Sequence, residues 1–265
     1  MLRAFKAYPT LLRAYWQQAL EYRIQIIMWT LAGTYPLVMM AVWLNLAKGG
    51  DIGGYGPSQF IGYYLGVVWI RRITYIWILS EMEERVRTGE LSAFLLRPLD
   101  VVHMVFTHIA AVRFFNALLV GIIVGGVLLL VPGQQWVLTP MNILAFCLVI
   151  PIGFLFEFFL QYLVGTLSFW TTQVQRIFDV FFFIKSLLGG FVVPLTLLPP
   201  TVQAVAKWLP FQASMALPAE ILIGKATPER VFAGALVSLA WVVVLAVASR
   251  VLWRAGVRSY GAVGA

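Results

Sequence analysis

Six runs of predominantly apolar residues dominate the chain, and each is long enough to cross a lipid bilayer as a helix of about 20 residues. The runs cover roughly residues 24–46, 58–80, 105–131, 141–169, 177–198 and 231–253. Hydrophobic residues make up 61% of the sequence and charged residues only 11%, which leaves too few polar residues to cover a soluble globule. The sequence therefore predicts an all-α membrane protein with six transmembrane helices in a single domain, residues 1–265.

Lysine and arginine collect on the cytoplasmic side of membrane proteins, so their distribution predicts the orientation of the spans. With the N-terminus inside, eleven of the 19 cations fall in cytoplasmic segments, four in outer segments and four within the spans. We therefore expect both termini to be cytoplasmic. Topology also accounts for the net charge of +8 without a nucleic-acid partner, because the cations are thinly spread between apolar runs and form no basic face.

Two segments outside the spans are too apolar to be simple loops. Residues 1–23 mix apolar residues with arginine and lysine and are broken early by Pro9, which is typical of a helix lying in the inner membrane interface. Residues 199–230 are interrupted at Pro210 and Pro218 into pieces too short to span the bilayer. We expect short re-entrant or interfacial helices on the outer side, because backbone at membrane depth must satisfy its hydrogen bonds within the protein.

The sequence lacks the motifs that would supply energy or covalent chemistry. The nearest approach to a phosphate-binding loop, at Gly224 and Lys225, has no following Ser or Thr and no glycine five residues earlier. His103 and His108 are five residues apart and lie on different helix faces, and Cys147 is the single cysteine. No metal or other cofactor is therefore expected in this chain, and any energy source must lie outside it.

The densest charge lies in residues 81–104, the predicted cytoplasmic segment between spans two and three. We expect its charged residues to continue the second helix until Gly89 ends it, after which Ser92 caps a short helix that Pro98 stops. This short helix carries Leu95 and its apolar neighbours into the cytoplasm, where an uncovered apolar face is costly. Either a partner subunit or the protein's own interfacial helix must cover that face.

Four stretches give the chain a resemblance to the membrane subunits of type 2 ABC exporters, in particular the six-span bacterial branch that pairs with a separate ATP-binding subunit. They are GELSAFLLRPL in residues 89–99, VPLTLLPP in 193–200, the LPF and PAE pieces in 209–220, and the basic tail RAGVRSYGAVGA in 254–265. The resemblance implies a dimer of six-span subunits, either a homodimer or a heterodimer of related permeases. It also implies that each subunit contacts an ABC ATP-binding subunit, which holds the ATP and Mg²⁺.

The resemblance further implies a coupling helix at that contact, and it identifies the segment between spans five and six with the family's re-entrant helices. The coupling residues that it implies are Thr88, Gly89, Glu90, Leu91, Ser92, Phe94, Leu95, Leu96, Arg97 and Pro98. Spans two and five of such subunits line the central cavity between the two protomers. Both spans of this chain are rich in aromatic residues, so a role in the substrate pathway stands beside plain packing or contact with lipid.

Six charged residues fall within the predicted spans, where a cation at the bilayer centre costs about 2.5–3.5 kcal/mol. They are Arg71, Arg72, Arg113, Glu157, Asp179 and Lys185. For most of them, pairing or reaching toward the inner headgroups is the favoured interpretation. Glu157 is the deepest and most isolated acid, and two interpretations stay open: an ion-pair strut with a basic partner, or a residue of the transport pathway. The predicted substrate-pathway set is Tyr63, Tyr64, Trp69, Glu157, Phe181, Phe182 and Phe191.

The leading hypothesis is a permease subunit in the bacterial plasma membrane that exports amphiphilic or lipophilic compounds, drug-like or toxic to the cell, because an aromatic cavity binds bulky apolar molecules without demanding one shape. Export of a lipid or lipid-linked polysaccharide is the alternative, favoured by the excess of intramembrane cations over acids. A multi-span lipid-modifying enzyme would show a cluster of His, Asp or Cys at one interface. A channel or ion-coupled carrier would show paired intramembrane acids or an inverted repeat. Neither signature is evident.

Overall fold

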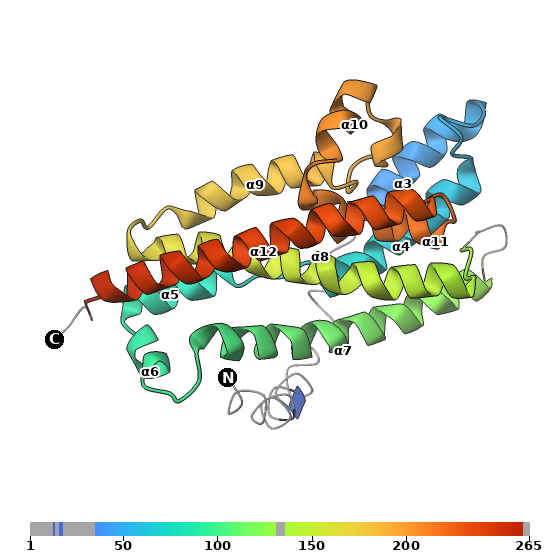
Figure 1. Ribbon diagram of the computed structural model, residues 1–265. Coiled ribbons are helices and arrows are strands. Elements are labelled where there is room, and N and C mark those ends of the chain that lie inside the picture. Colours follow the sequence, from blue (N-terminus) through green and yellow to red (C-terminus); the bar gives the residue numbers. More distant parts are fainter. Residues whose placement is uncertain (1–12, 14–15, 18–34, 131–135, 262–265) are drawn as a thin grey trace.

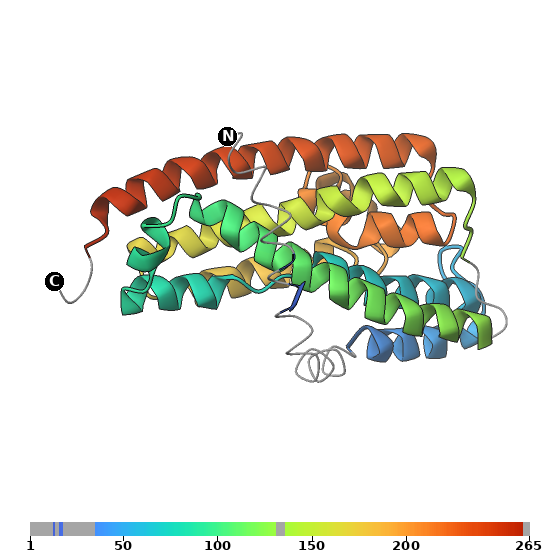
Figure 2. The ribbon, with the colours of Figure 1, turned by 90° about the horizontal axis from the view of Figure 1, so that it is seen from below.

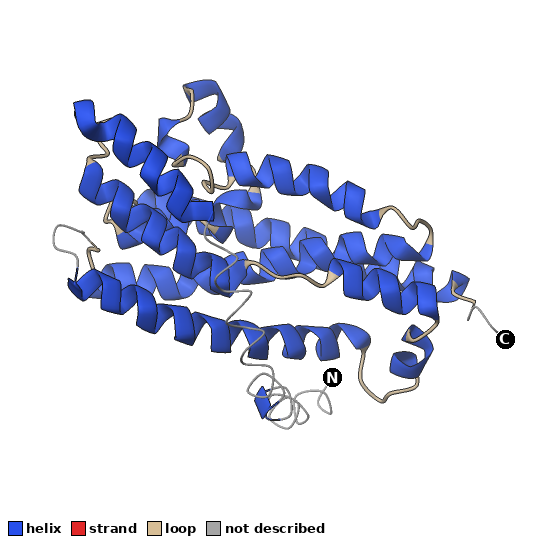
Figure 3. Cartoon of the chain, turned by 180° about the vertical axis from the view of Figure 1, so that it is seen from behind, coloured by secondary structure: helices blue, strands red, loops and turns tan. Residues whose placement is uncertain are grey.

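The computed structural model describes residues 13, 16–17, 35–130 and 136–261 (Figure 1). Within these ranges the regular structure is helical, apart from an isolated antiparallel bridge between Ile52 and Tyr55 (Figure 3). The predicted all-α class is therefore confirmed. The predicted interfacial helix at 1–23 lies almost wholly outside the described residues, as do residues 24–34 of the first predicted span.

Among the described residues, three helices are long and apolar enough to cross a membrane by length and composition: α7 (Val101–Leu130), α8 (Pro140–Thr166, extended by the 3₁₀ turn η2, Leu167–Phe169) and α12 (Pro228–Ser259). They correspond to predicted spans three, four and six. At 1.5 Å per residue, the 32 residues of α12 extend about 48 Å, well beyond a hydrocarbon core of about 30 Å.

A Thr-Pro pair starts both α8 and α12. The hydroxyl of Thr139 accepts the backbone N–H of Asn142 (3.2 Å), and the hydroxyl of Thr227 accepts that of Arg230 (3.3 Å). The proline that follows each threonine occupies the first helical position, where its missing N–H leaves no bond unmade. Both starts are therefore determined by local sequence.

The remaining described helices are shorter. They are α3 (Tyr35–Leu46), η1 (Ala47–Gly49), α4 (Pro57–Thr74), α5 (Leu79–Thr88), α6 (Leu91–Leu95), α9 (Val174–Leu188), η3 (Leu195–Leu197), α10 (Pro200–Ala206), η4 (Pro210–Ser214) and α11 (Ala216–Leu222). α8 and α12 pack along each other (Figure 2), and α4 contacts both α3 and α7.

Two predicted spans differ from the structure. The prediction of a continuous second helix through residues 58–80 is wrong, because α4 ends at Thr74 and the chain is non-helical at 75–78 before α5 begins. The predicted fifth span, 177–198, ends ten residues early, at Leu188. There Gly190 turns the chain with φ of 83°, a backbone conformation that favours glycine. The count of six spans stays a prediction.

The segment between α9 and α12 enters the helical bundle and returns. The segment first contacts the chain just before α4, where the hydroxyl of Thr196 donates to that of Tyr55 (2.9 Å). It then reaches the far end of α4, where the carbonyl of Ser214 accepts a hydrogen bond from the Thr74 hydroxyl (3.0 Å). α11 then leads back, because the carbonyl of Leu222 accepts the N–H of Val137 (2.7 Å), just before α8. All seven residues of α11 are buried. The predicted short helices between 199 and 230 are thus confirmed, and their depth in a membrane stays a prediction.

Seven of the predicted cytoplasmic cations belong to elements that meet at one end of the bundle. α5, α6, the start of α9 and the end of α12 meet at that end (Figure 1). These elements carry Arg85, Arg87, Arg97, Arg176, Arg250, Arg254 and Arg258. The predicted outer cations belong to elements toward the other end: Lys48, Lys207, Lys225 and Arg230. The orientation of the termini stays a prediction.

Candidate functional site

The break between α4 and α5 lies in a run of six residues, ITYIWI at 73–78, that are all β-branched or aromatic. Such side chains lose rotamer freedom in a helix, so the local preference for helix is weak here. The run contains neither proline nor glycine, the usual signals of a helix break. Its composition was the signal that could have indicated the interruption.

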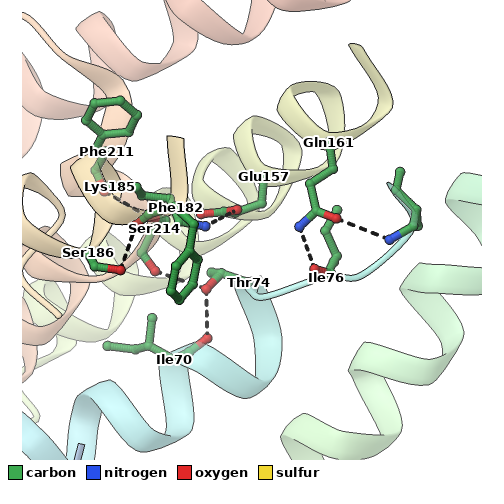
Figure 4. Close-up of polar contacts among 11 residues, drawn as sticks. Ile70, Thr74, Ile76, Glu157, Gln161, Phe182, Lys185, Ser186, Phe211 and Ser214 are labelled. Carbon is green, nitrogen blue, oxygen red and sulfur yellow. Dashed lines mark hydrogen bonds and ion pairs between the residues drawn. The ribbon is translucent and has the colours of Figure 1, made fainter. Parts of the chain in front are cut away.

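Gln161 of α8 satisfies the backbone that the break leaves open. Its side-chain carbonyl accepts the N–H of Ile78 (3.1 Å), and its side-chain amide donates to the carbonyl of Ile76 (Figure 4). Gln161 is fully buried, as are both isoleucines. Each buried polar group left without a partner costs about 1–3 kcal/mol, so the two hydrogen bonds of Gln161 remove most of the cost of interrupting the helix.

One turn away on the same face of α8, Glu157 forms an ion pair with Lys185 of α9 (Figure 4). The carboxylate oxygen Oε2 lies 2.8 Å from the Lys185 ammonium, and the exposed fractions of the two residues are 0% and 3%. The basic partner that the first interpretation of Glu157 required is therefore present. The other carboxylate oxygen of Glu157, Oε1, is buried without a hydrogen-bond partner among the described residues.

A pocket opens beside this ion pair, between the end of α4, the break and α9. It is lined by Arg71, Tyr75, Phe182, Lys185, Ser186, Phe191 and Met215. The Arg71 guanidinium carbon lies 4.8 Å from the ring centroids of both Tyr75 and Phe191, and the Lys185 ammonium lies 5.6 Å from that of Phe182. Cations over aromatic faces gain about 0.5–2 kcal/mol each. The structure thus joins two cations and three aromatic rings at one site.

Of the predicted substrate-pathway residues, Phe182 and Phe191 line this pocket, and Glu157 contacts it through Lys185. The other four lie elsewhere: Tyr63, Tyr64, Trp69 and Phe181. Phe181 is on the exposed side of α9. The pathway role of all seven stays a prediction.

Tyr63, Tyr64 and Trp69 fix backbone around α4. The hydroxyls of Tyr63 and Tyr64 donate to the carbonyls of Gly190 and Val192, both at 2.7 Å, and so hold the non-helical chain that follows α9. The Trp69 indole N–H donates to the carbonyl of residue 117 in α7 (2.9 Å), and its ring stacks on two aromatic neighbours. These contacts give the three residues a packing function in the subunit.

The α5–α6 arm, residues 79–98, carries the predicted coupling residues. Gly89 ends α5 with φ of 80°, as predicted. The prediction that Ser92 caps the next helix is wrong: α6 begins at Leu91, its N-cap position is Glu90, and Ser92 lies within the helix without a capping bond. α6 also ends three residues before Pro98, since the residue that precedes a proline is disfavoured in a helix.

The apolar face of α6 is covered only in part. Leu91 is buried among residues of α5 and α7, and Phe94 lies between the guanidinium groups of Arg85 and Arg97, at 4.2 and 4.6 Å. The remaining apolar pair is exposed, by 37% at Leu95 and 88% at Leu96. The polar coupling residues Thr88, Glu90 and Arg97 beside them are also exposed, as is Pro98.

The other intramembrane charges have different surroundings. Asp179 accepts a hydrogen bond from Gln175 (3.0 Å) within α9. The positive charges of Arg71 and Arg72 repel the Arg113 side chain of α7. The Nε atom of Arg113 is buried without a hydrogen-bond partner among the described residues. For Arg113, pairing or reaching toward the inner headgroups stays a prediction.

Sequence analysis missed a second buried ion pair, between Glu220 of α11 and Arg230 of α12. Two guanidinium nitrogens of Arg230 contact the two carboxylate oxygens at 2.6 and 3.1 Å, and Glu220 is fully buried. A bidentate pair of this kind fixes geometry as well as charge. It ties the returning segment to the start of the last long helix, and an acid within an otherwise apolar seven-residue helix was the available signal.

Comparison with protein families accounts for this architecture. The family model described as "ABC-2 family transporter protein" matches residues 32–264. A search of curated proteins found no sequence significantly similar to this chain. The matched region includes the break between α4 and α5, the α5–α6 arm, the aromatic pocket and the returning segment, which is most of the chain. ABC-2 permeases are the membrane subunits of transporters and are not themselves catalytic. The chain therefore belongs to the ABC-2 transporter family and is a membrane protein of the permease type.

Proposed function

We propose that this protein is the permease subunit of an ATP-driven exporter, and that it moves amphiphilic or lipophilic compounds, drug-like or toxic to the cell, from the cytoplasm or inner leaflet outward. In this proposal two permease subunits, identical or related, form the conduit in the bacterial plasma membrane with their termini in the cytoplasm. A separate ABC ATP-binding subunit binds ATP and Mg²⁺ and supplies the energy. Membership in the ABC-2 family supports this assignment.

The observation that carries the proposal is the uncovered apolar tip of the α5–α6 arm. Leu95 and Leu96 are exposed at the end of the bundle where the cations gather, and an exposed apolar pair flanked by charged residues is typical of a protein interface. The arm joins α4 through the non-helical residues 75–78 and packs against α8 and α9. Movement of Leu95 and Leu96 by a partner subunit would therefore be transmitted through α5 to the elements that surround the pocket.

The pocket supports the substrate class. Its aromatic and aliphatic walls suit an apolar body, and its cations suit a polar group at one end of the same molecule. A lipid or lipid-linked polysaccharide is the alternative substrate, since a lipid phosphate would meet the same chemistry. Sensitivity of a deletion strain to lipophilic compounds, measured beside its glycolipid profile, separates the two substrates.

Replacing both Leu95 and Leu96 with aspartate is expected to reduce recovery of the ATP-binding subunit with the purified permease at least tenfold, because two carboxylates would be desolvated in an apolar contact. The measurement is affinity purification from the native host, with the ATP-binding subunit quantified by mass spectrometry. Val205→Asp is the matched control, since Val205 is exposed on α10 away from the arm. Unchanged recovery of the ATP-binding subunit with the double variant, at normal membrane insertion, would place the contact elsewhere.

A further inference from the structure

We propose that the pocket between α4 and α9 recognises a negatively charged group, such as phosphate, sulfate or carboxylate, on an amphiphilic substrate, and that Arg71 is its principal ligand. The inference rests on the proposed export of amphiphiles and names the charge that the permease selects. It starts from how the pocket's charges are compensated within the subunit.

The acid nearest the pocket is already neutralised. Glu157 contacts the Lys185 ammonium at 2.8 Å, so this pair contributes little net charge to a ligand beside it. Arg71 has no such partner: among the described residues no carboxylate lies within ion-pair distance of it. Its compensation comes from the rings of Tyr75 and Phe191 and from the more distant field of Glu157.

The Arg71 guanidinium hydrogen-bonds the side chain of Tyr75, which occupies part of its set of five N–H donors and leaves the others for a ligand. Those N–H groups match the oxygens of a phosphate, sulfate or carboxylate, which accept two parallel bonds from one arginine. One further cation reinforces the preference, because Arg113 interacts electrostatically with Arg71. The local field is therefore positive, and an anion entering the pocket relieves the repulsion among these groups.

The walls of the pocket select an amphiphile over a free ion. Phe182, Phe191 and Met215 supply apolar surface, which provides affinity to an alkyl chain and none to a small hydrated anion. The unpartnered oxygen of Glu157 would favour a cationic ligand, and aromatic faces attract quaternary ammonium groups. A cation at this site would also face Arg71 and Lys185. The order of affinity that follows is anionic, then neutral, then cationic amphiphile.

The pocket also borders the non-helical residues 75–78 that connect α4 to α5. Tyr75 is both a wall of the pocket and the first non-helical residue after α4. A ligand held by Arg71 and Tyr75 therefore contacts the connection through which the α5–α6 arm is attached. Anion binding at this position is expected to alter ATP hydrolysis by the partner as well as to occupy the site.

The test uses the complete transporter in nanodiscs of phosphatidylcholine, without nucleotide, and isothermal titration calorimetry. The probes are dodecyl phosphate, dodecyl maltoside and dodecyltrimethylammonium, which share one alkyl chain, and inorganic phosphate. We expect dodecyl phosphate to bind at least about tenfold more tightly than the other two amphiphiles, as the loss of one charge-assisted contact predicts. Millimolar inorganic phosphate is expected not to displace it.

Arg71→Gln is expected to remove this preference, and Arg71→Lys to retain most of it. Arg72→Gln is the matched control: it removes the same charge from the adjacent residue, which does not line the pocket, and is expected to change affinity less than about threefold. Equal binding of the three amphiphiles, tighter binding of the cation, displacement by inorganic phosphate, or an unchanged preference in Arg71→Gln would each overturn the inference. Transport is measured separately, so absence of ATP-driven transport alongside anion-selective binding would refute the proposed function and leave the site intact.

Discussion

Replacing Glu157 with glutamine is expected to lower the free energy of unfolding by about 3–5 kcal/mol, because Lys185 would remain as a buried cation without its partner. The two residues are almost completely buried and contact each other at 2.8 Å, so water cannot solvate the remaining Lys185 ammonium without opening the bundle. Chemical denaturation of the detergent-solubilised protein measures the effect. A loss below about 1 kcal/mol would show that the pair does not hold α8 to α9.

The double variant Glu157→Gln with Lys185→Met separates the two interpretations of Glu157. Removing both charges leaves no unpaired ion and is expected to recover most of the lost stability. Transport by the double variant should recover with it if the pair is a strut, whereas recovered stability without transport would assign Glu157 to the substrate pathway. Asp179→Asn is the matched control on α9, because Asp179 contacts a glutamine in an exposed position and should cost little.

Replacing Gln161 with leucine is expected to cost about 2–6 kcal/mol, since the N–H of Ile78 and the carbonyl of Ile76 would both be buried without partners. These two groups belong to the break between α4 and α5, so the variant should also loosen the attachment of the arm. We expect the surviving protein to retain its ATP-binding partner and to lose most of its transport. Hydrogen exchange at residues 75–78 should rise in the same variant.

Gln203→Leu provides the comparison for Gln161. Gln203 also binds two backbone groups, the carbonyls of Thr196 and Leu198, at 3.0 and 2.7 Å, but it is half-buried on α10, where water can replace the amide. A small effect at Gln203 and a large one at Gln161 would attribute the difference to burial. Equal effects at the two positions, or full transport in Gln161→Leu, would contradict the function assigned to the hydrogen bonds of Gln161 with Ile76 and Ile78.

The long helices were predictable because their determinants are local. The Thr-Pro starts of α8 and α12 and the apolar composition of their interiors are all present in the sequence itself, as is the glycine that ends α5. The break at 75–78 was not predictable from periodicity, because the side chain that stabilises it, Gln161, lies 83 residues away from Ile78. Local preference weakened the helix, and a tertiary contact decided where it opened.

The candidate site divides in the same way. Sequence analysis predicted that a buried Glu157 requires a basic partner, but the packing of α9 on α8 determined that the partner is Lys185 and not one of the three arginines. It also placed Ser92 at the N-cap of a helix, because serine is a strong cap, although the N-cap lies two residues earlier, at Glu90. Aromatic content indicated spans two and five, and only the fold separated the pocket residues from those that hold backbone.

The central claim, that this chain carries substrate with energy from another subunit, is tested most directly in proteoliposomes. They should contain the permease with or without its copurified ATP-binding subunit, and the measurement is ATP-dependent accumulation of fluorescently labelled dodecyl phosphate and dodecyltrimethylammonium. We expect accumulation of at least one of these amphiphiles only when both subunits and ATP are present, and its loss in the Leu95→Asp, Leu96→Asp variant. ATP hydrolysis by this chain alone, or equal accumulation without the ATP-binding subunit, would contradict the proposed function.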